Sequence, residues 1–115
     1  MPVAKPIDHA AYARRVFPEW SVVRDESNAH KTVVRKGSVR AAFHQSGAIA
    51  LEAGFNGFAV SPHGMFPQTV TAGGDGREHL STDHSRALLR AGLRALTAQK
   101  RRFGTGFGGR FPTQL

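Results

Sequence analysis

The chain has 115 residues, the length of one domain, since two cores of half that size would each be marginal. It is 40% hydrophobic, lacks cysteine and has no long apolar run, which excludes disulfides, thiolate metal sites, cysteine nucleophiles and a transmembrane helix. Sixteen Lys and Arg against eight Asp and Glu give a net charge of +8, which indicates an anionic partner.

The first expected helix runs from about His9 to Phe17. Asp8 can accept hydrogen bonds from the free amides of its first turn, and Pro18 ends it. The residues that follow, 20–24 (Trp-Ser-Val-Val-Arg), predict a short strand leading into a polar loop.

A hairpin is expected where residues 31–36 and 39–44 flank Gly37-Ser38, a two-residue turn signal with glycine first. That turn pairs Arg35 with Arg40 and Val34 with Ala41.

The next connection decides the register of the sheet. A three-residue loop over residues 45–47, with Gly47 in the left-handed region, places Ile49 beside Phe43 and Leu51 beside Ala41. A two-residue loop would turn Ile49 and Leu51 to the opposite face. We favour three residues, because a slip of one residue inverts the whole hydrophobic set.

A second hairpin is predicted at Asn56-Gly57, with Phe55 beside Phe58. Beyond it we expect a loop over residues 61–67 and one more short strand over residues 69–72. The expected apolar face comprises Val34, Val39, Ala41, Phe43, Ile49, Leu51, Ala53, Phe55, Phe58 and Val60.

A second helix is expected from Ser81 or Thr82, either of which can cap it, to about Phe103. Its predicted apolar side comprises Leu88, Leu89, Gly92, Leu93, Leu96 and Phe103. The glycine-rich residues 104–115 predict a flexible arm. We therefore predict an α+β fold: a single domain, residues 1–103, in which an antiparallel meander of four to six strands carries the N-terminal and the long C-terminal helix on one face.

The basic residues are concentrated at the C-terminal end. Residues 1–83 carry nine basic and eight acidic side chains, whereas residues 84–115 carry seven basic and no acidic ones. The seven are Arg86, Arg90, Arg94, Lys100, Arg101, Arg102 and Arg110. On a helix, Arg86, Arg90 and Arg94 stand above one another with no acidic residue three or four positions from Arg90 or Arg94. Phosphates could supply the counter-charge, although a solvated basic face is the plainer alternative.

Two further features could contact a partner. Arg35, Arg40 and Lys31 are expected on one face of the first hairpin, either as a second anion-binding surface or as charges that resist aggregation. In the C-terminal arm, Phe107 and Phe111 could stack on bases or, more in keeping with a single intervening arginine, dock on a protein.

Catalysis is not expected. Six histidines are present, but His79 and His84 are five residues apart, which does not suit two ligands on one helical face. We expect no metal, no cofactor and no enzymatic activity.

The sequence thus predicts a small basic binding protein that engages nucleic acid, or a complex that handles nucleic acid, through its second helix. The alternative is an inhibitor or adaptor, of the kind phages and mobile elements use against host defence nucleases, docked on an acidic protein surface of a nucleoprotein complex. We expect a cytoplasmic protein, because the chain lacks cysteine and no secretory leader is recognised, and we expect no membrane partner. The smooth sheet face and the aromatic arm would allow a homodimer.

Overall fold

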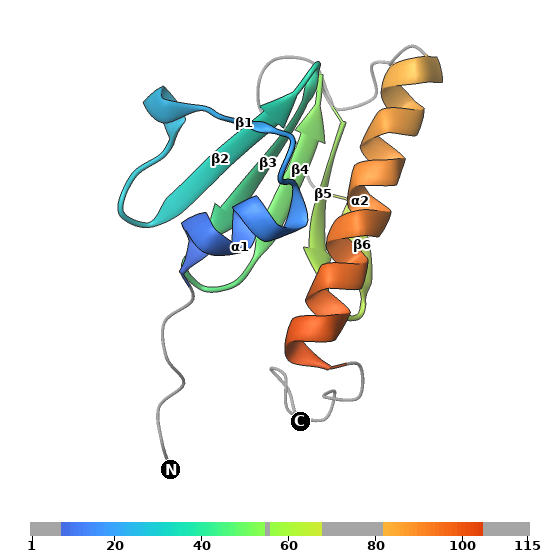
Figure 1. The fold of residues 1–115 in the computed structure, drawn as a ribbon. Helices are drawn as coiled ribbons and strands as arrows, with labels where there is room; N and C mark the ends of the chain where they lie inside the picture. Colours follow the sequence, from blue (N-terminus) through green and yellow to red (C-terminus); the bar gives the residue numbers. More distant parts are fainter. Residues whose placement is uncertain (1–7, 55, 68–81, 105–115) are drawn as a thin grey trace.

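The computed structural model describes residues 8–54, 56–67 and 82–104. The elements in chain order are α1 (His9–Val16), β1 (Ser21–Val22), the short 3-10 helix η1 (Arg24–Glu26), β2 (Lys31–Lys36), β3 (Val39–His44), β4 (Ile49–Ala53), β5 (Asn56–Ser61), β6 (Gly64–Pro67) and α2 (Thr82–Phe103). The strands form one antiparallel sheet in the order β1-β2-β3-β4-β5-β6 (Figure 1). The predicted α+β meander is confirmed.

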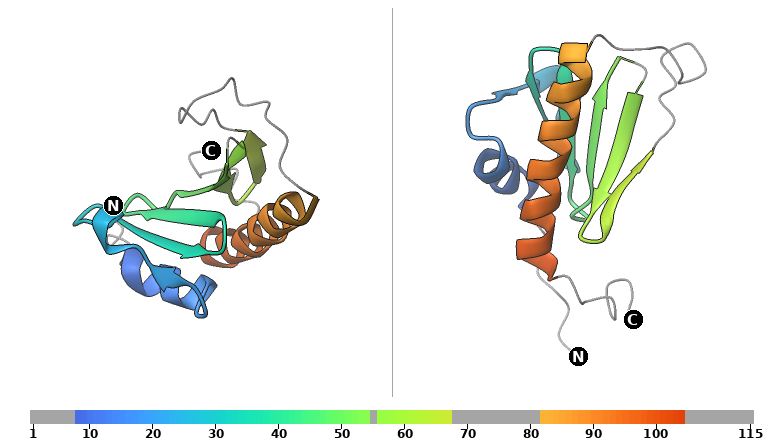
Figure 2. Two further views of the ribbon diagram at one scale, coloured as in Figure 1. Left: turned by 90° about the horizontal axis from the view of Figure 1, so that it is seen from above. Right: turned by 90° about the vertical axis from the view of Figure 1, so that its right-hand side faces the viewer.

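Both helices pack on the same face of this sheet, as expected (Figure 2). Helix α1 contacts β2 and β3, whereas α2 contacts mainly β4 and β5. The two helices also touch each other, so that the N-terminal and C-terminal parts of the described chain close one core.

The local signals around α1 act as expected. The Asp8 side chain accepts a hydrogen bond of 3.1 Å from the backbone amide of Ala11, which satisfies one free donor of the first turn. Phe17 leaves the helical conformation, and Pro18 follows it. The buried side of this helix is formed by Tyr12, Ala13 and Val16.

The register predicted for the first three long strands is confirmed. Arg35 lies opposite Arg40 across the Gly37-Ser38 turn, as the two-residue loop requires. Gly47 adopts a φ of 98°, and the three-residue loop that it closes places Leu51 opposite Ala41. Leu51 is fully buried while Ala50 is half-buried, so the apolar set faces the helices.

The turn predicted at Asn56-Gly57 is wrong. Gly54, with a φ of 62°, begins the turn instead, and Leu51 lies opposite Phe58. This register pairs the whole of β4 with β5, whereas a turn at Asn56-Gly57 would bring Leu51 opposite Pro62, which has no amide to donate. Because the difference is an even number of residues, Phe58 and Val60 still lie on the predicted face; Phe55 lies outside the described residues.

Two strand limits also differ from prediction. Strand β1 contains only Ser21–Val22, because Arg24 already belongs to the 3-10 helix. Part of the loop expected over residues 61–67 is strand β6, in which Met65 pairs with Val60 and packs against the core. The short strand predicted over residues 69–72 lies outside the described residues.

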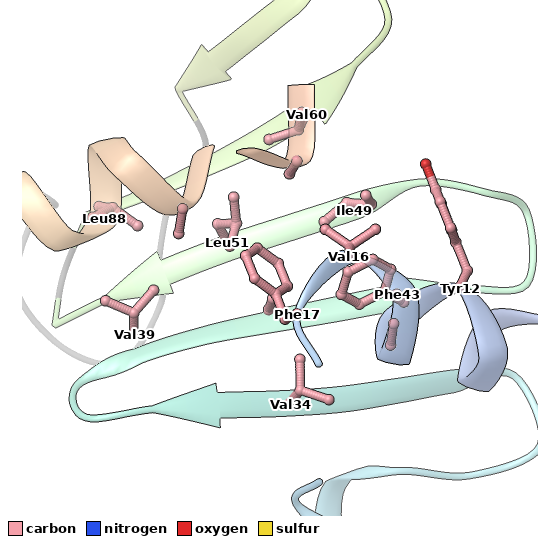
Figure 3. Packing of buried hydrophobic residues seen from close by; sticks show 14 of the residues in the cluster. Tyr12, Val16, Phe17, Val34, Val39, Phe43, Ile49, Leu51, Val60 and Leu88 are labelled. Atoms are coloured by element: carbon pink, nitrogen blue, oxygen red, sulfur yellow. The ribbon is translucent and has the colours of Figure 1, made fainter. Parts of the chain in front are cut away.

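The core lies between the sheet and the two helices (Figure 3). The Phe17 ring contacts Phe43 edge-to-face, with centroids 5.9 Å apart, and Tyr12 contacts the same ring at 5.6 Å. The buried apolar cluster comprises Tyr12, Ala13, Val16, Phe17, Val34, Val39, Ala41, Phe43, Ile49, Leu51, Ala53, Val60, Leu88, Ala91 and Ala95.

Helix α2 is rotated about its axis relative to the prediction, by roughly 70° at about 100° per residue. Leu89 and Leu93 are 47% and 49% exposed, although both were expected in the core. The buried side instead carries Leu88, Ala91, Gly92, Ala95 and Gln99. Small residues let the helix axis approach the sheet: a Cβ on Gly92 would lie 2.4 Å from Met65 Sδ. The helix therefore turns its small residues toward the sheet, because close packing along its whole length outweighs the burial of Leu89 and Leu93.

Candidate nucleic-acid interface

The outer side of α2 carries four basic side chains, which we call the α2 cations: Arg86, Arg90, Lys100 and Arg101. Of the predicted residues, Arg86, Arg90, Lys100, Arg101 and Arg102 are all exposed. Arg86, Arg90, Lys100 and Arg101 form no ion pair and no hydrogen bond through their side chains with any side chain that the structure describes. This side of the helix is therefore open to an external anion.

Arg94 differs from its neighbours. Its Nη1 and Nη2 donate to Oε2 and Oε1 of Glu19 over 2.7 and 3.2 Å, and its guanidinium lies 5.3 Å from the centroid of the Phe17 ring. The hydrogen bond from Arg94 is the main reason why the pKa of Glu19 lies below its usual range. No acidic residue lies three or four positions from Arg94 on the helix, but the fold brings it a partner that is 75 positions away.

Arg102 lies at the junction of the two helices. Its guanidinium is 4.9 Å from the centroid of the Tyr12 ring, and Arg15 approaches the same ring at 5.9 Å. Burial raises the pKa of Tyr12 to about 12 despite these two cations, so the phenol stays protonated at neutral pH. Arg15 and Arg102 therefore lie against the same ring, an arrangement that the sequence did not reveal.

The predicted cations of the first hairpin, Lys31, Arg35 and Arg40, do not join this group, because they lie on the opposite face of the sheet. Arg40 forms ion pairs with Glu26 and Glu52, and Arg35 Nε donates to the carbonyl of Gly37 over 3.1 Å. The charge of Arg40 is thus balanced within the chain, which favours a structural role over the second anion-binding surface that was considered.

Lys31 is half-buried opposite His44 on β3. Burial is the main reason why the pKa of His44 lies below its usual range, and Lys31 and His9 lower it further. These groups form a small cluster at the end of the hairpin where β2 begins.

The imidazole of His9 and the hydroxyl of Thr32 are hydrogen-bonded at this end of the sheet. His9 Nδ1 lies 2.6 Å from Thr32 Oγ1, and His9 Nε2 lies 3.1 Å from the carbonyl oxygen of Ala29. Since that carbonyl can only accept, Nε2 carries the proton in the neutral ring, and the Thr32 hydroxyl donates to Nδ1. Thr32 is buried and out of reach of a substrate, so the pair anchors α1 to β2.

A pocket with a volume of about 620 Å³ opens beside the α2 cations, between α2, the segment that follows α1 and the β2–β3 turn. We call it the Trp20 pocket. Arg90 and Arg94 line it from α2, and Lys36 and Trp20 line it from the other two segments. Sequence reasoning missed Lys36 and Trp20; the hairpin register could have placed Lys36 on the helix side of the sheet, but nothing local indicates the pocket.

Several predicted site residues cannot be placed. Arg110, Phe107 and Phe111 lie outside the described residues, as does His79, and the side chain of His84 is not described either. The proposed arm over residues 104–115 is described only at Gly104, whose amide donates to the Lys100 carbonyl at the end of α2.

Within the described ranges, no helix is both long enough and apolar enough to cross a lipid bilayer. The fold and the site together define an α+β protein with a basic outer helix beside a half-apolar pocket. Comparisons with known protein families, with curated proteins and with solved structures find no match. The function must therefore be inferred from the residues of the site themselves.

Proposed function

We propose that this chain is a small, non-enzymatic basic protein that binds nucleic acid through the α2 cations. The observation that carries the proposal is the exposure of Arg86, Arg90, Lys100 and Arg101 without an acidic partner among the side chains that the structure describes. Like charges one turn apart on a helix are destabilising by a few tenths of a kcal/mol per pair. A polyanion offsets that cost and gains counterion release at each phosphate contact.

The geometry suits a long anion better than a small one. Arg86 and Arg101 are separated by 15 residues, which corresponds to about 22 Å along a helix, or roughly six base-pair steps along the axis of a duplex. A single small anion cannot contact both ends of such a row. A backbone with regularly spaced phosphates can do so.

The direct test is binding of fluorescent single-stranded and duplex DNA and RNA at a series of salt concentrations. We expect the logarithm of the affinity to fall linearly with the logarithm of salt, with a slope of about −3 for three to four phosphate contacts. Absence of binding at low salt to all four probes would overturn the proposal.

A second candidate function is docking on an acidic protein surface, as an inhibitor or adaptor of a nucleoprotein complex would do. The observation in its favour is the exposure of Leu89 and Leu93 close to Arg86 and Arg90 on α2. Binding of phosphates would leave these two leucines exposed to solvent. In a protein interface they would be buried at its apolar centre. Retention of partners after nuclease treatment of a lysate, with loss of binding in Leu89→Asp with Leu93→Asp, would support this candidate.

A further inference from the structure

The Trp20 pocket is assembled from three segments that are distant in sequence. Trp20 follows α1, Lys36 and Val39 flank the β2–β3 turn, and Ala87 and Arg90 come from the first half of α2. Its volume of about 620 Å³ lies well inside the range typical of small-molecule sites. The pocket is large enough for one small ligand and too small for a folded partner.

The inner part of the pocket is apolar. Phe17, Val39 and Ala91 are buried and form its floor, and Trp20 and Ala87 are half-buried at its sides. The rings of Trp20 and Phe17 are stacked, with centroids 4.1 Å apart, so the indole is held in a fixed orientation. A rigid aromatic and apolar surface favours a flat, poorly hydrated group.

The rim of the pocket is charged. Lys36, Arg90 and Arg94 line it against a single carboxylate, Glu19, which leaves two positive charges in excess. Since Glu19 already binds Arg94, the excess is carried by Lys36 and Arg90. The exposed Ser38 at the same rim adds a hydroxyl donor. A ligand that matches this rim carries close to two negative charges.

We propose that the Trp20 pocket binds a single nucleotide unit with a terminal phosphate, the base lying against Trp20 and Ala87 and the phosphate between Lys36 and Arg90. A phosphate monoester carries nearly two negative charges at neutral pH, whereas the phosphodiester inside a strand carries one. Inorganic phosphate would leave the apolar floor unused, and a nucleoside would leave the cations unused. The group occurs both in a free nucleoside monophosphate and at the phosphorylated 5′ end of a strand. Binding of a strand end rests on the nucleic-acid-binding function proposed above. Binding of a free nucleotide is independent of that function.

The chain contains one tryptophan, so its fluorescence reports on this pocket alone. Titration with adenosine monophosphate, excited where nucleotides do not absorb, should quench Trp20 with a saturable curve. Adenosine and inorganic phosphate should each bind at least about tenfold more weakly, the loss expected for one charge-assisted contact or its apolar counterpart.

Variants separate the pocket from the rest of the surface. Lys36→Ala should weaken nucleotide binding about tenfold, whereas Lys31→Ala, a lysine of the same strand on the opposite face, should leave it unchanged. Ala87→Leu narrows the pocket on a helical residue, so it should block binding while the folded spectrum and the unfolding midpoint are kept. Unaltered binding in both Lys36→Ala and Ala87→Leu, or equal binding of adenosine and its monophosphate, would overturn the proposal.

The two sources of the ligand are distinguished with one oligonucleotide in two forms. If strand ends are bound, the 5′-phosphorylated form should quench Trp20 and bind tighter than the 5′-hydroxyl form, and Lys36→Ala should abolish this preference. If only the free nucleotide quenches Trp20, the pocket is a nucleotide site unconnected with strands. If neither does, the proposal fails, while salt-dependent binding of both oligonucleotides would still support the function proposed for α2.

Discussion

The hydroxyl of Tyr12 on α1 donates a hydrogen bond of 2.6 Å to Oε1 of Gln99 on α2, inside the core. The amide nitrogen of Gln99 donates in turn to the carbonyl oxygens of Gly47 and Val60, over 2.9 and 3.0 Å. One buried side chain thus joins both helices, the β3–β4 loop and strand β5. Every polar atom of this side chain has a partner, which is the condition under which a buried amide stabilises a core.

Replacing Gln99 by alanine should destabilise the fold by about 3 kcal/mol, because the variant leaves the buried Tyr12 hydroxyl without its partner, removes the hydrogen bonds to the Gly47 and Val60 carbonyls and opens a cavity. The exposed Gln45 in the β3–β4 loop provides the matched control, and Gln45→Ala should change stability by less than about 0.5 kcal/mol. Urea unfolding of the two variants measures the difference. Equal midpoints would show that the Gln99 network does not hold the helices.

Truncation of a leucine should destabilise the fold strongly inside the core and only slightly outside it. Leu51→Ala should cost about 2–5 kcal/mol, since Leu51 is buried between the sheet and α2. Leu93→Ala should cost less than about 0.5 kcal/mol, because that side chain is half-exposed. Thermal unfolding of both variants tests the rotation of α2, and a large loss in Leu93→Ala would contradict it.

Charge reversal on α2 should weaken nucleic-acid binding without unfolding the protein. Arg86→Glu with Arg90→Glu removes two contacts, so the salt slope should become shallower by about 2 and the affinity at low salt should fall at least about tenfold. Arg14→Glu with Arg24→Glu changes the net charge equally at exposed positions outside α2. Equal losses in the two double variants would indicate a general charge effect instead of a binding surface.

A chain ending at Gly104 should distinguish the two candidate functions. It keeps the whole of α2 and six of the seven basic residues that follow position 83, losing only Arg110. Nucleic-acid affinity should therefore fall by no more than the loss of one phosphate contact. If Phe107 and Phe111 anchor a protein partner, the same truncation should abolish partner capture while the unfolding midpoint stays the same.

Stability should decrease as the pH falls from about 7 to 5, in part through His44. Burial lowers the pKa of this imidazole in the folded state, so the unfolded chain binds the proton more readily in this interval. The contribution is therefore present above the unfolded pKa and is lost as the pH falls through the folded pKa. His44→Asn should flatten the pH dependence of the urea midpoint, and an unchanged profile would exclude His44 as its source.

The strand register could be predicted from turn chemistry and from the alternation of apolar residues wherever one face of the sheet is buried. The Gly37-Ser38 turn and the choice of three residues for the Gly47 loop follow from turn chemistry and from the need to keep Phe43, Ile49 and Leu51 on one side. The third turn was misplaced because Gly54 and Gly57 both permit a turn and both registers keep the same face buried. Alternation alone cannot separate two registers that differ by an even number of residues.

The candidate site was predictable only as a list of cations. That Arg86 and Arg90 share an exposed helix face follows from their spacing, and this part of the interface needed no tertiary structure. The partner of Arg94 could not be predicted from the sequence, because Glu19 is 75 positions away along the chain. The same holds for the Trp20 pocket, whose lining residues are brought together only when α2 packs beside α1 and the first hairpin.

The sequence by itself determined most of the elements, most of the strand register and the concentration of charge in α2, because each of these depends on contacts between neighbours along the chain or on turn chemistry. Only the tertiary structure decided how α2 is rotated on the sheet. The helix has two apolar sides, one rich in leucine and one of small residues with Gln99, and periodicity favours the larger side chains. Close packing on Met65 and Leu51 and the hydrogen bonds of Gln99 favour the smaller ones, which leaves Leu89 and Leu93 exposed beside the arginines.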